Sequence, residues 1–138
     1  EKLKGKKFDY IVGNGILHHL YFNLDFALSK LKELLNPGGK IIFIEPNIYN
    51  PYCFFIFKIP YFRRLASLEP SEMAFSKNFI FKKLNFTNFN EINIKFKDFL
   101  LPNTPKPLIL PLIILGYIFE KLPFFRLLSQ SIVIVAKN

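Results

Sequence analysis

Two histidines and one glutamate are the side chains of this sequence best suited to proton chemistry. His18 and His19 are adjacent, and neighbouring positions of a helix point about 100° apart, so we do not expect them to chelate one metal ion. No His-Glu-x-x-His spacing occurs, and Cys53 is the only cysteine, which excludes a cysteine-rich metal site. A neutral His19 could accept a proton, and Glu45 could act as a general base or orient an acceptor. The sequence therefore predicts catalysis without a metal.

These side chains lie beside short apolar runs that are typical of strands. Residues 8–12 form the first run, which ends at a Gly-Asn-Gly turn, and residues 40–44 form the second, which ends at Glu45. Between them, residues 23–35 carry apolar side chains at helical spacing, and a Pro-Gly-Gly turn stops the pattern. Strands that are apolar throughout indicate burial on both faces, and hence a parallel sheet covered by helices.

The segments that follow the two strands define the expected site, because ligands of open α/β sheets bind beyond the carboxyl ends of the strands. The candidate residues are Gly13, Asn14, Gly15 and Ile16 after the first strand, and Asn47, Tyr49 and Tyr52 after the second. Each has a plainer interpretation. The Gly-Asn-Gly turn could close a hairpin, Glu45 could be a paired structural acid, His19 could pack at the start of a helix, and the two tyrosines could be lid packing.

The second half of the chain contains further strands and one capped helix. Residues 48–75 are rich in aromatic side chains and proline, and we expect an apolar, lid-like insertion there. Ser76 is a plausible N-cap for a short helix that ends near Asn85-Phe86, and Asn85 would take the left-handed conformation. Residues 93–99 and 131–136 are predicted to be the last two strands.

An apolar segment lies around residues 105–128. Residues 108–119 are uncharged, but a membrane-spanning helix needs ~20 residues and Pro111 interrupts this run. The segment is therefore a core helix, a lid over a lipophilic acceptor, or a membrane-surface segment. Glu69 and Glu72 lie between elements, nothing in the sequence fixes their direction, and we expect both to be solvated.

Residues 8–20 and 34–46 together resemble class I S-adenosylmethionine-dependent methyltransferases, especially those acting on small molecules, lipids and quinones. The strand, the Leu-His-His-Leu that follows it, and the later Leu-Leu-Asn-Pro-Gly-Gly before a second strand are similar to the fourth and fifth strands of that family. The resemblance implies a partial Rossmann-like α/β fold with a mostly parallel sheet, an antiparallel C-terminal edge pair and the first strands missing. Residues 1–138 would be the C-terminal part of one methyltransferase domain.

The resemblance also implies a cofactor and a substrate class. S-adenosyl-L-methionine would contact Gly13, Asn14, Gly15 and Ile16, His19 would lie near the cleft, and a small-molecule or lipid-like acceptor would be methylated. The Gly-rich loop and the ribose-binding acid of the family cannot be placed in this sequence. We therefore expect either a fragment that is incompetent alone or a degenerate, non-catalytic binding module.

The charge of the chain favours anionic partners. The net charge is +9, but the basic residues are dispersed, which indicates a solvated surface with a weak attraction to anions. No basic stripe is interleaved with aromatic residues, so nucleic acid is not favoured as a partner. The single cysteine is typical of a reducing cytosol. We expect a cytoplasmic protein, with peripheral association at a membrane surface as the alternative.

Overall fold

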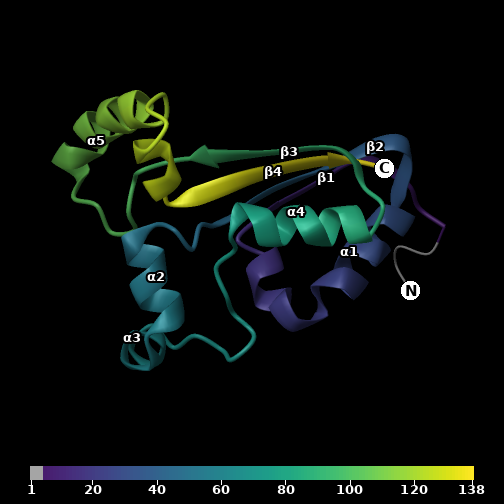
Figure 1. Ribbon diagram of the computed structural model, residues 1–138, viewed down its shortest axis with the longest axis horizontal. Helices are drawn as coiled ribbons and strands as arrows, with labels where there is room; N and C mark the ends of the chain where they lie inside the picture. The colour runs from purple at the N-terminus through teal and green to yellow at the C-terminus, as the bar shows by residue number, and fades with distance from the viewer. Residues whose placement is uncertain (1–4) are drawn as a thin grey trace.

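The computed structural model describes residues 5–138, which form a four-stranded sheet with helices (Figure 1). In chain order the strands (β), α-helices (α) and 3-10 helices (η) are β1 (Phe8–Asn14), η1 (Leu17–Asn23), α1 (Leu24–Glu33), β2 (Leu35–Pro46), α2 (Pro51–Lys58), α3 (Pro60–Leu65), α4 (Lys77–Phe86), β3 (Asn90–Lys97), α5 (Lys106–Phe119), η2 (Phe125–Leu128) and β4 (Ser131–Lys137). In Figure 1, α1 and α4 lie along one face of the sheet, whereas α2, α3 and α5 lie beyond one end of it.

The sheet has the order β1-β2-β4-β3. β1 and β2 are parallel, with Ile11 opposite Ile41, and η1 and α1 form the crossover between them. β4 is antiparallel both to β2 and to β3. This topology confirms the predicted α/β fold with an antiparallel pair of strands at one edge.

The core lies between the sheet and the two helices that cover it. Its members share near-complete burial and come from strands, α1, α4 and the segment before α4; they include Leu28, Ile41, Phe43, Phe75, Ile80, Leu84, Ile132 and Ile134. Burying one such side chain stabilises the folded state by about 1.5–3 kcal/mol. The cluster therefore fixes α1 and α4 against the sheet and sets the direction in which the strand ends point.

The prediction that the first strand is buried on both faces is wrong. Tyr10 and Val12 are 62% and 69% exposed, and Ile44 is 39% exposed, so the same prediction is wrong for β2. These side chains point to the face of the sheet that α1 and α4 do not cover, opposite to the buried Ile41 and Phe43. β1 is an edge strand, and within residues 5–138 no strand pairs with its outer side. The hairpin interpretation of the Gly-Asn-Gly turn is also wrong, because the strands on either side of the crossover run parallel.

β2 begins earlier than the predicted residues 40–44. The backbone N–H of Phe8 donates to the carbonyl of Leu34 at 2.9 Å, and Leu35 pairs with Phe8. The register then shifts so that Tyr10 lies opposite Lys40. The Pro-Gly-Gly segment is consequently an irregular part of the strand, with Gly38 at a φ of +78°, a conformation that glycine adopts without steric cost.

Both ends of α4 are predicted correctly, because the helix runs from Lys77 to Phe86. The left-handed residue predicted at Asn85 is wrong. Ser76 is the N-cap, and its Oγ accepts a hydrogen bond from the N–H of Phe79 at 3.2 Å. Asn85 lies inside the last turn, and the left-handed residue is Asn88, with a φ of +58°. The helix is followed by the C-cap Thr87, whose hydroxyl donates to the carbonyl of Lys83 at 3.0 Å. The reversal therefore comes three residues later than predicted.

The apolar segment at residues 48–75 contains α2 and α3, and the segment at residues 105–128 contains α5 and η2. The Asn50 side chain caps α2 by accepting from the N–H of Cys53 at 3.1 Å. In α5, which continues through Pro111, only Gly116 is buried, so the core-helix interpretation is wrong. No helix within residues 5–138 is long and apolar enough to cross a membrane.

Candidate functional site

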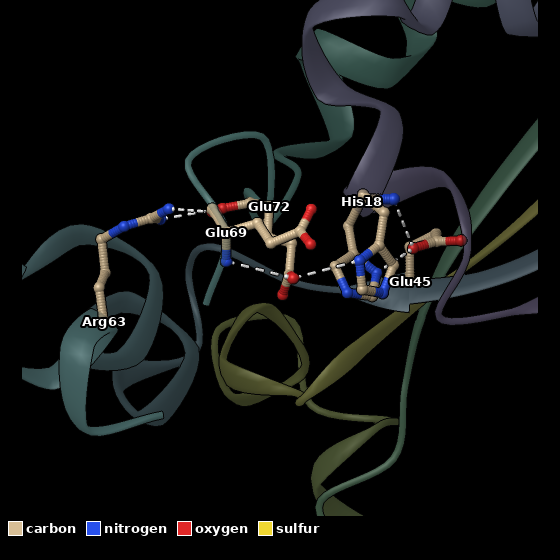
Figure 2. A network of polar contacts seen from close by, with 6 residues as sticks. His18, Glu45, Arg63, Glu69 and Glu72 are labelled. Atoms are coloured by element: carbon tan, nitrogen blue, oxygen red, sulfur yellow. Dashed lines mark hydrogen bonds and ion pairs between the residues drawn. The ribbon is translucent and has the colours of Figure 1, made fainter. Parts of the chain in front are cut away.

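The carboxylate of Glu45 anchors the turn that follows β1. Its Oε1 accepts hydrogen bonds from the backbone N–H groups of Ile16 at 3.0 Å and Leu17 at 2.7 Å. Its Oε2 accepts from the backbone N–H of His18 at 3.1 Å and lies 2.9 Å from Nδ1 of the same residue (Figure 2). The first N–H groups of a helix have no hydrogen-bond partner within the helix. This buried carboxylate at the end of β2 therefore accepts from the backbone N–H groups at the start of η1 that would otherwise lack a partner.

These contacts bear on the two roles considered for Glu45. A carboxylate offers about four lone-pair sites, and four donors already surround this one. Because a carboxylate only accepts, the Nδ1 of His18 carries its proton when Glu45 is ionised, which directs Nε2 of the ring elsewhere. The side chain of Glu45 is fully buried, and the contacts favour the paired structural acid over a general base.

His19 lies beside a second acid. Its Nδ1 is 3.3 Å from Oε1 of Glu72, and its side chain is 47% exposed. We expected the two histidines to point apart and not to share a metal ion, but their ring centroids are 4.1 Å apart. Ligand atoms of His18, His19 and Glu72 lie within 4.8 Å of one another. The N–H of Met73 donates to the carbonyl of His18 at 3.1 Å, which holds the start of η1 against the segment that carries Glu72.

The expectation that both Glu69 and Glu72 are solvated is wrong for Glu72, which is buried. Arg63 explains the difference, because its guanidinium donates to the carbonyl oxygens of Phe57 at 2.8 Å and Glu72 at 2.9 Å, and also to that of Glu69. Figure 2 shows Arg63 beside Glu69 and Glu72 in this network. The loop is thereby folded so that the Glu72 carboxylate points to His19 while the Glu69 side chain stays exposed. The partner of His19 is remote in sequence, and no local motif indicated it.

A pocket of about 340 Å³ opens at the carboxyl ends of β1 and β2, within the ~300–1,000 Å³ typical of small-molecule sites. The polar and turn residues that line it include Asn14, Gly15, His18, Tyr52 and the buried Glu45. Its apolar walls include Ile44, Cys53, Ile56, Phe57 and Leu68. Burial raises the pKa of the Cys53 thiol to about 11. Cys53 is therefore a neutral wall residue and not a nucleophile at neutral pH.

Other candidate residues lie outside this pocket. Asn47 is fully buried, and its Nδ2 donates to the carbonyls of Leu127 at 2.8 Å and Ser129 at 2.7 Å. It ties the end of β2 to the segment before β4, and its amide faces the protein interior. Tyr49 and Ile16 are about half exposed and are not among the residues that line the pocket.

Gly13 and Gly15 serve different purposes in the turn. A Cβ on Gly13 would lie 2.3 Å from Cε1 of Phe43, so glycine is required by close packing inside β1. Gly15 has a φ of +61°, and a Cβ there would meet only Cε1 of His18 at 3.5 Å. The Gly15 N–H donates to the carbonyl of Ile44 at 2.8 Å, which keeps the turn beside the end of β2. Asn14 is thereby left exposed at the rim of the pocket.

Solved methyltransferases share this arrangement over nearly the whole chain. A methyltransferase dependent on S-adenosylmethionine from Archaeoglobus fulgidus superposes with a TM-score of 0.62 at 18% identity, over 99% of this chain and 62% of that one. The chain has the fold of class I methyltransferases. A putative O-methyltransferase from Nostoc punctiforme superposes with a TM-score of 0.56 at 18% identity. The match includes 99% of this chain and 33% of that one. Phosphoethanolamine N-methyltransferase 2 from Haemonchus contortus, solved with S-adenosyl-L-methionine, superposes with a TM-score of 0.54 at 14% identity. The match includes 95% of this chain and 33% of that one.

The chain spans less than two thirds of the length of each of these solved methyltransferases. No protein-family model matches the sequence, and no curated protein matches it. The methyltransferase fold therefore rests on the architecture, and in particular on the sheet order and the strand directions.

Proposed function

We propose that this chain forms the acceptor side and part of the cofactor side of an S-adenosylmethionine-dependent methyltransferase acting on a small-molecule or lipid-like acceptor. The observation that carries the proposal is the turn after β1, which Glu45 fixes beside a pocket at the carboxyl ends of two parallel strands. In open α/β sheets this is the edge where ligands bind.

The residues of the turn fit one side of such a cofactor. Asn14 offers an exposed amide, Gly15 leaves the approach open because it has no Cβ, and Ile16 presents an apolar side chain that is about half exposed. Gly13 acts through packing against Phe43 and sets the direction of the turn. When bound, S-adenosylmethionine supplies an electrophilic methyl group, and the protein contributes alignment and an apolar surrounding.

On the acceptor side, we assign proton uptake to His19, which does not line the pocket itself but whose ring centroid lies 4.1 Å from that of the lining residue His18. Its ring is about half exposed and lies beside the Glu72 carboxylate, which can orient the ring and stabilise a positive charge on it. Tyr52 lies at the pocket wall and is suited to contact the acceptor. In this proposal Glu45 acts as a positioning residue through His18, while Asn47 and Tyr49 support the segment that follows β2.

We further propose that the cofactor site is incomplete in this chain alone. The sequence contains neither the Gly-rich loop nor the ribose-binding acid that the resemblance leads us to expect. The outer edge of β1 is unpaired within residues 5–138, and its Tyr10 and Val12 are exposed. Polypeptide that pairs with this edge would supply the remaining half of the site and give the backbone of β1 its missing partners. Because side chains of a strand point to the faces of the sheet, Tyr10 and Val12 would be covered by an element packed on the face opposite α1 and α4.

Calorimetric titration of S-adenosylmethionine tests the proposal. We would compare this chain with a version extended upstream in the encoding gene, and we expect saturable binding by the extended version only. Val is larger than Gly and disfavours positive φ, so Gly15→Val should abolish that binding, whereas Phe86→Ala, on the exposed surface of α4, should not alter it. If the extended version does not bind the cofactor, the enzyme proposal fails and the degenerate binding module takes its place.

A further inference from the structure

The segment formed by α5 and η2 exposes an unusually continuous apolar surface. Of the fourteen residues of α5, Gly116 alone is buried. The large apolar side chains that are exposed are Leu108, Leu110, Ile113, Ile114, Leu115, Tyr117 and Ile118 in α5, followed by Leu122, Phe124, Phe125, Leu127 and Leu128. Single exposed apolar residues are ordinary, but contiguous patches mark surfaces that bind a partner or a membrane.

A few contacts near its end attach this helix to the rest of the protein. A Cβ on Gly116 would lie 3.2 Å from the Cβ of Phe99, so glycine permits a close approach at this point. The ring of Phe119 contacts Phe99 and stacks on Phe125, with centroids 5.5 Å and 5.0 Å apart. Figure 1 shows α5 standing beyond the end of the sheet. The apolar side chains of its first three turns are therefore presented outward.

A cationic groove lies directly beside this apolar surface. The groove has a volume of about 520 Å³ and is lined by the basic residues Lys77, Lys95, Lys97, Lys121 and Arg126, together with one acid, Glu120. Glu120 pairs with Lys97, so four of the five cations are left to attract an anion. The ammonium groups of Lys97 and Lys121 also lie 5.7 Å and 5.0 Å from the ring centroid of Tyr117, which joins the groove to α5.

We propose that α5, η2 and this groove form a docking surface for an anionic phospholipid bilayer. The apolar side chains would enter the interface with α5 lying in its plane, and lipid phosphates would be attracted into the groove. A second copy of the chain is a poorer occupant, because it carries the same +9 charge and would bring two cationic grooves together. This docking surface does not depend on methyl transfer.

The position of the surface relative to the pocket has a consequence for substrates. Ser131, at the start of β4, lies opposite Pro46 at the end of β2, so α5 and η2 meet the sheet at the same end as the pocket. Pro102, Gln130 and Ser131 from the flanks of this segment also line the pocket. A protein docked in this way would hold the pocket near the headgroup region.

Tryptophan fluorescence can test the docking directly, because the chain contains no tryptophan. Phe124→Trp and Leu110→Trp place a reporter on the proposed surface, and Phe26→Trp on α1 is the matched control, since Phe124 and Phe26 are 83% and 68% exposed. With vesicles of phosphatidylglycerol and phosphatidylcholine we expect a blue shift and quenching by brominated lipid for the first two reporters only. Circular dichroism would check that each variant keeps the fold.

The contribution of charge is tested on the same reporters. Replacing Lys121 or Arg126 by Gln should weaken partitioning onto the anionic vesicles about fivefold for each cation removed. Lys82→Gln, on the exposed face of α4, should change it little. The proposal is overturned if the Phe124→Trp reporter does not respond to anionic vesicles, if Phe26→Trp responds equally, or if the shift follows protein concentration without lipid.

Discussion

Replacing Glu45 is the most direct test of how the site is held together. Glu45→Ala would leave the N–H groups of Ile16, Leu17 and His18 and the His18 ring without their acceptor. Removing one member of a buried charged network typically costs 3–5 kcal/mol, and a hydrogen bond to a charged group contributes about 1.5–3 kcal/mol. We therefore expect Glu45→Ala to lower the free energy of unfolding by about 4 kcal/mol.

Glu45→Gln separates the structural role from a catalytic one. Its amide oxygen can still accept from Ile16 and Leu17, but its NH₂ group would face the donors of His18. We expect a loss of about 2 kcal/mol from one mismatched pair of donors. Because domains of this kind are stable by only ~5–15 kcal/mol, both losses should be visible as lower midpoints of urea denaturation.

Urea denaturation followed by far-UV circular dichroism provides the measurement, with an unchanged slope required for the comparison. Glu33→Ala is the matched control, because Glu33 is an exposed acid paired with Lys30 at 2.7 Å, and such surface pairs contribute only ~0.3–0.5 kcal/mol. If Glu45→Ala unfolds within about 1 kcal/mol of the unmodified chain, the anchoring role of the carboxylate is refuted. If Glu45→Gln keeps full stability and only catalysis is lost in a complete enzyme, Glu45 is a general base.

Three further predictions concern residues around the site. Burial raises the pKa of the Cys53 thiol to about 11, so the native chain should resist iodoacetamide at pH 8 and react only as the pH rises towards about 11. The urea-unfolded chain should react at pH 8. Rapid labelling of the native chain at pH 8, seen by mass spectrometry, would contradict this prediction. Gly13→Ala places a Cβ against the Phe43 ring and should cost about 1–3 kcal/mol in urea denaturation, and Phe43→Leu in the same chain should restore part of that loss if the clash is its cause. Asn88 has a positive φ, a conformation that costs alanine ~1 kcal/mol. Asn88→Gly should therefore raise the thermal midpoint slightly, and Asn88→Ala should lower it. Equal midpoints would show that this turn is not strained.

The sequence predicts most elements because their signals are local. The apolar runs of β1 and β2, the helical spacing of α1 and the Ser76 cap each involve residues within a few positions of one another. The antiparallel edge pair followed from the resemblance, since no local pattern sets strand direction. The left-handed residue after α4 was misplaced because two asparagines, Asn85 and Asn88, offer the same capping chemistry, and only the packing of the last turn decides between them.

The site was less predictable because its contacts join distant parts of the chain. Glu45 was identified from its place at a strand end, but its four donors lie 27–29 residues away. Asn47 was assigned to an acceptor pocket, and its amide instead holds backbone carbonyls 80 and 82 residues further on. The burial of Glu72 depends on how Arg63 folds its loop, which composition and spacing cannot reveal.

The position of β4 in the sheet also constrains the order of assembly during synthesis. β3 precedes β4 in the chain, but among residues 5–138 its only strand partner is β4, which lies between β3 and β2. β1 and β2 can pair as soon as residue 46 has left the ribosome, whereas β3 must remain without a partner until residues 131–137 emerge. Throughout that interval β3 and the apolar α5 are available to chaperones and to other nascent chains. A chain cut off within α5 would keep only the β1–β2 pair of this sheet.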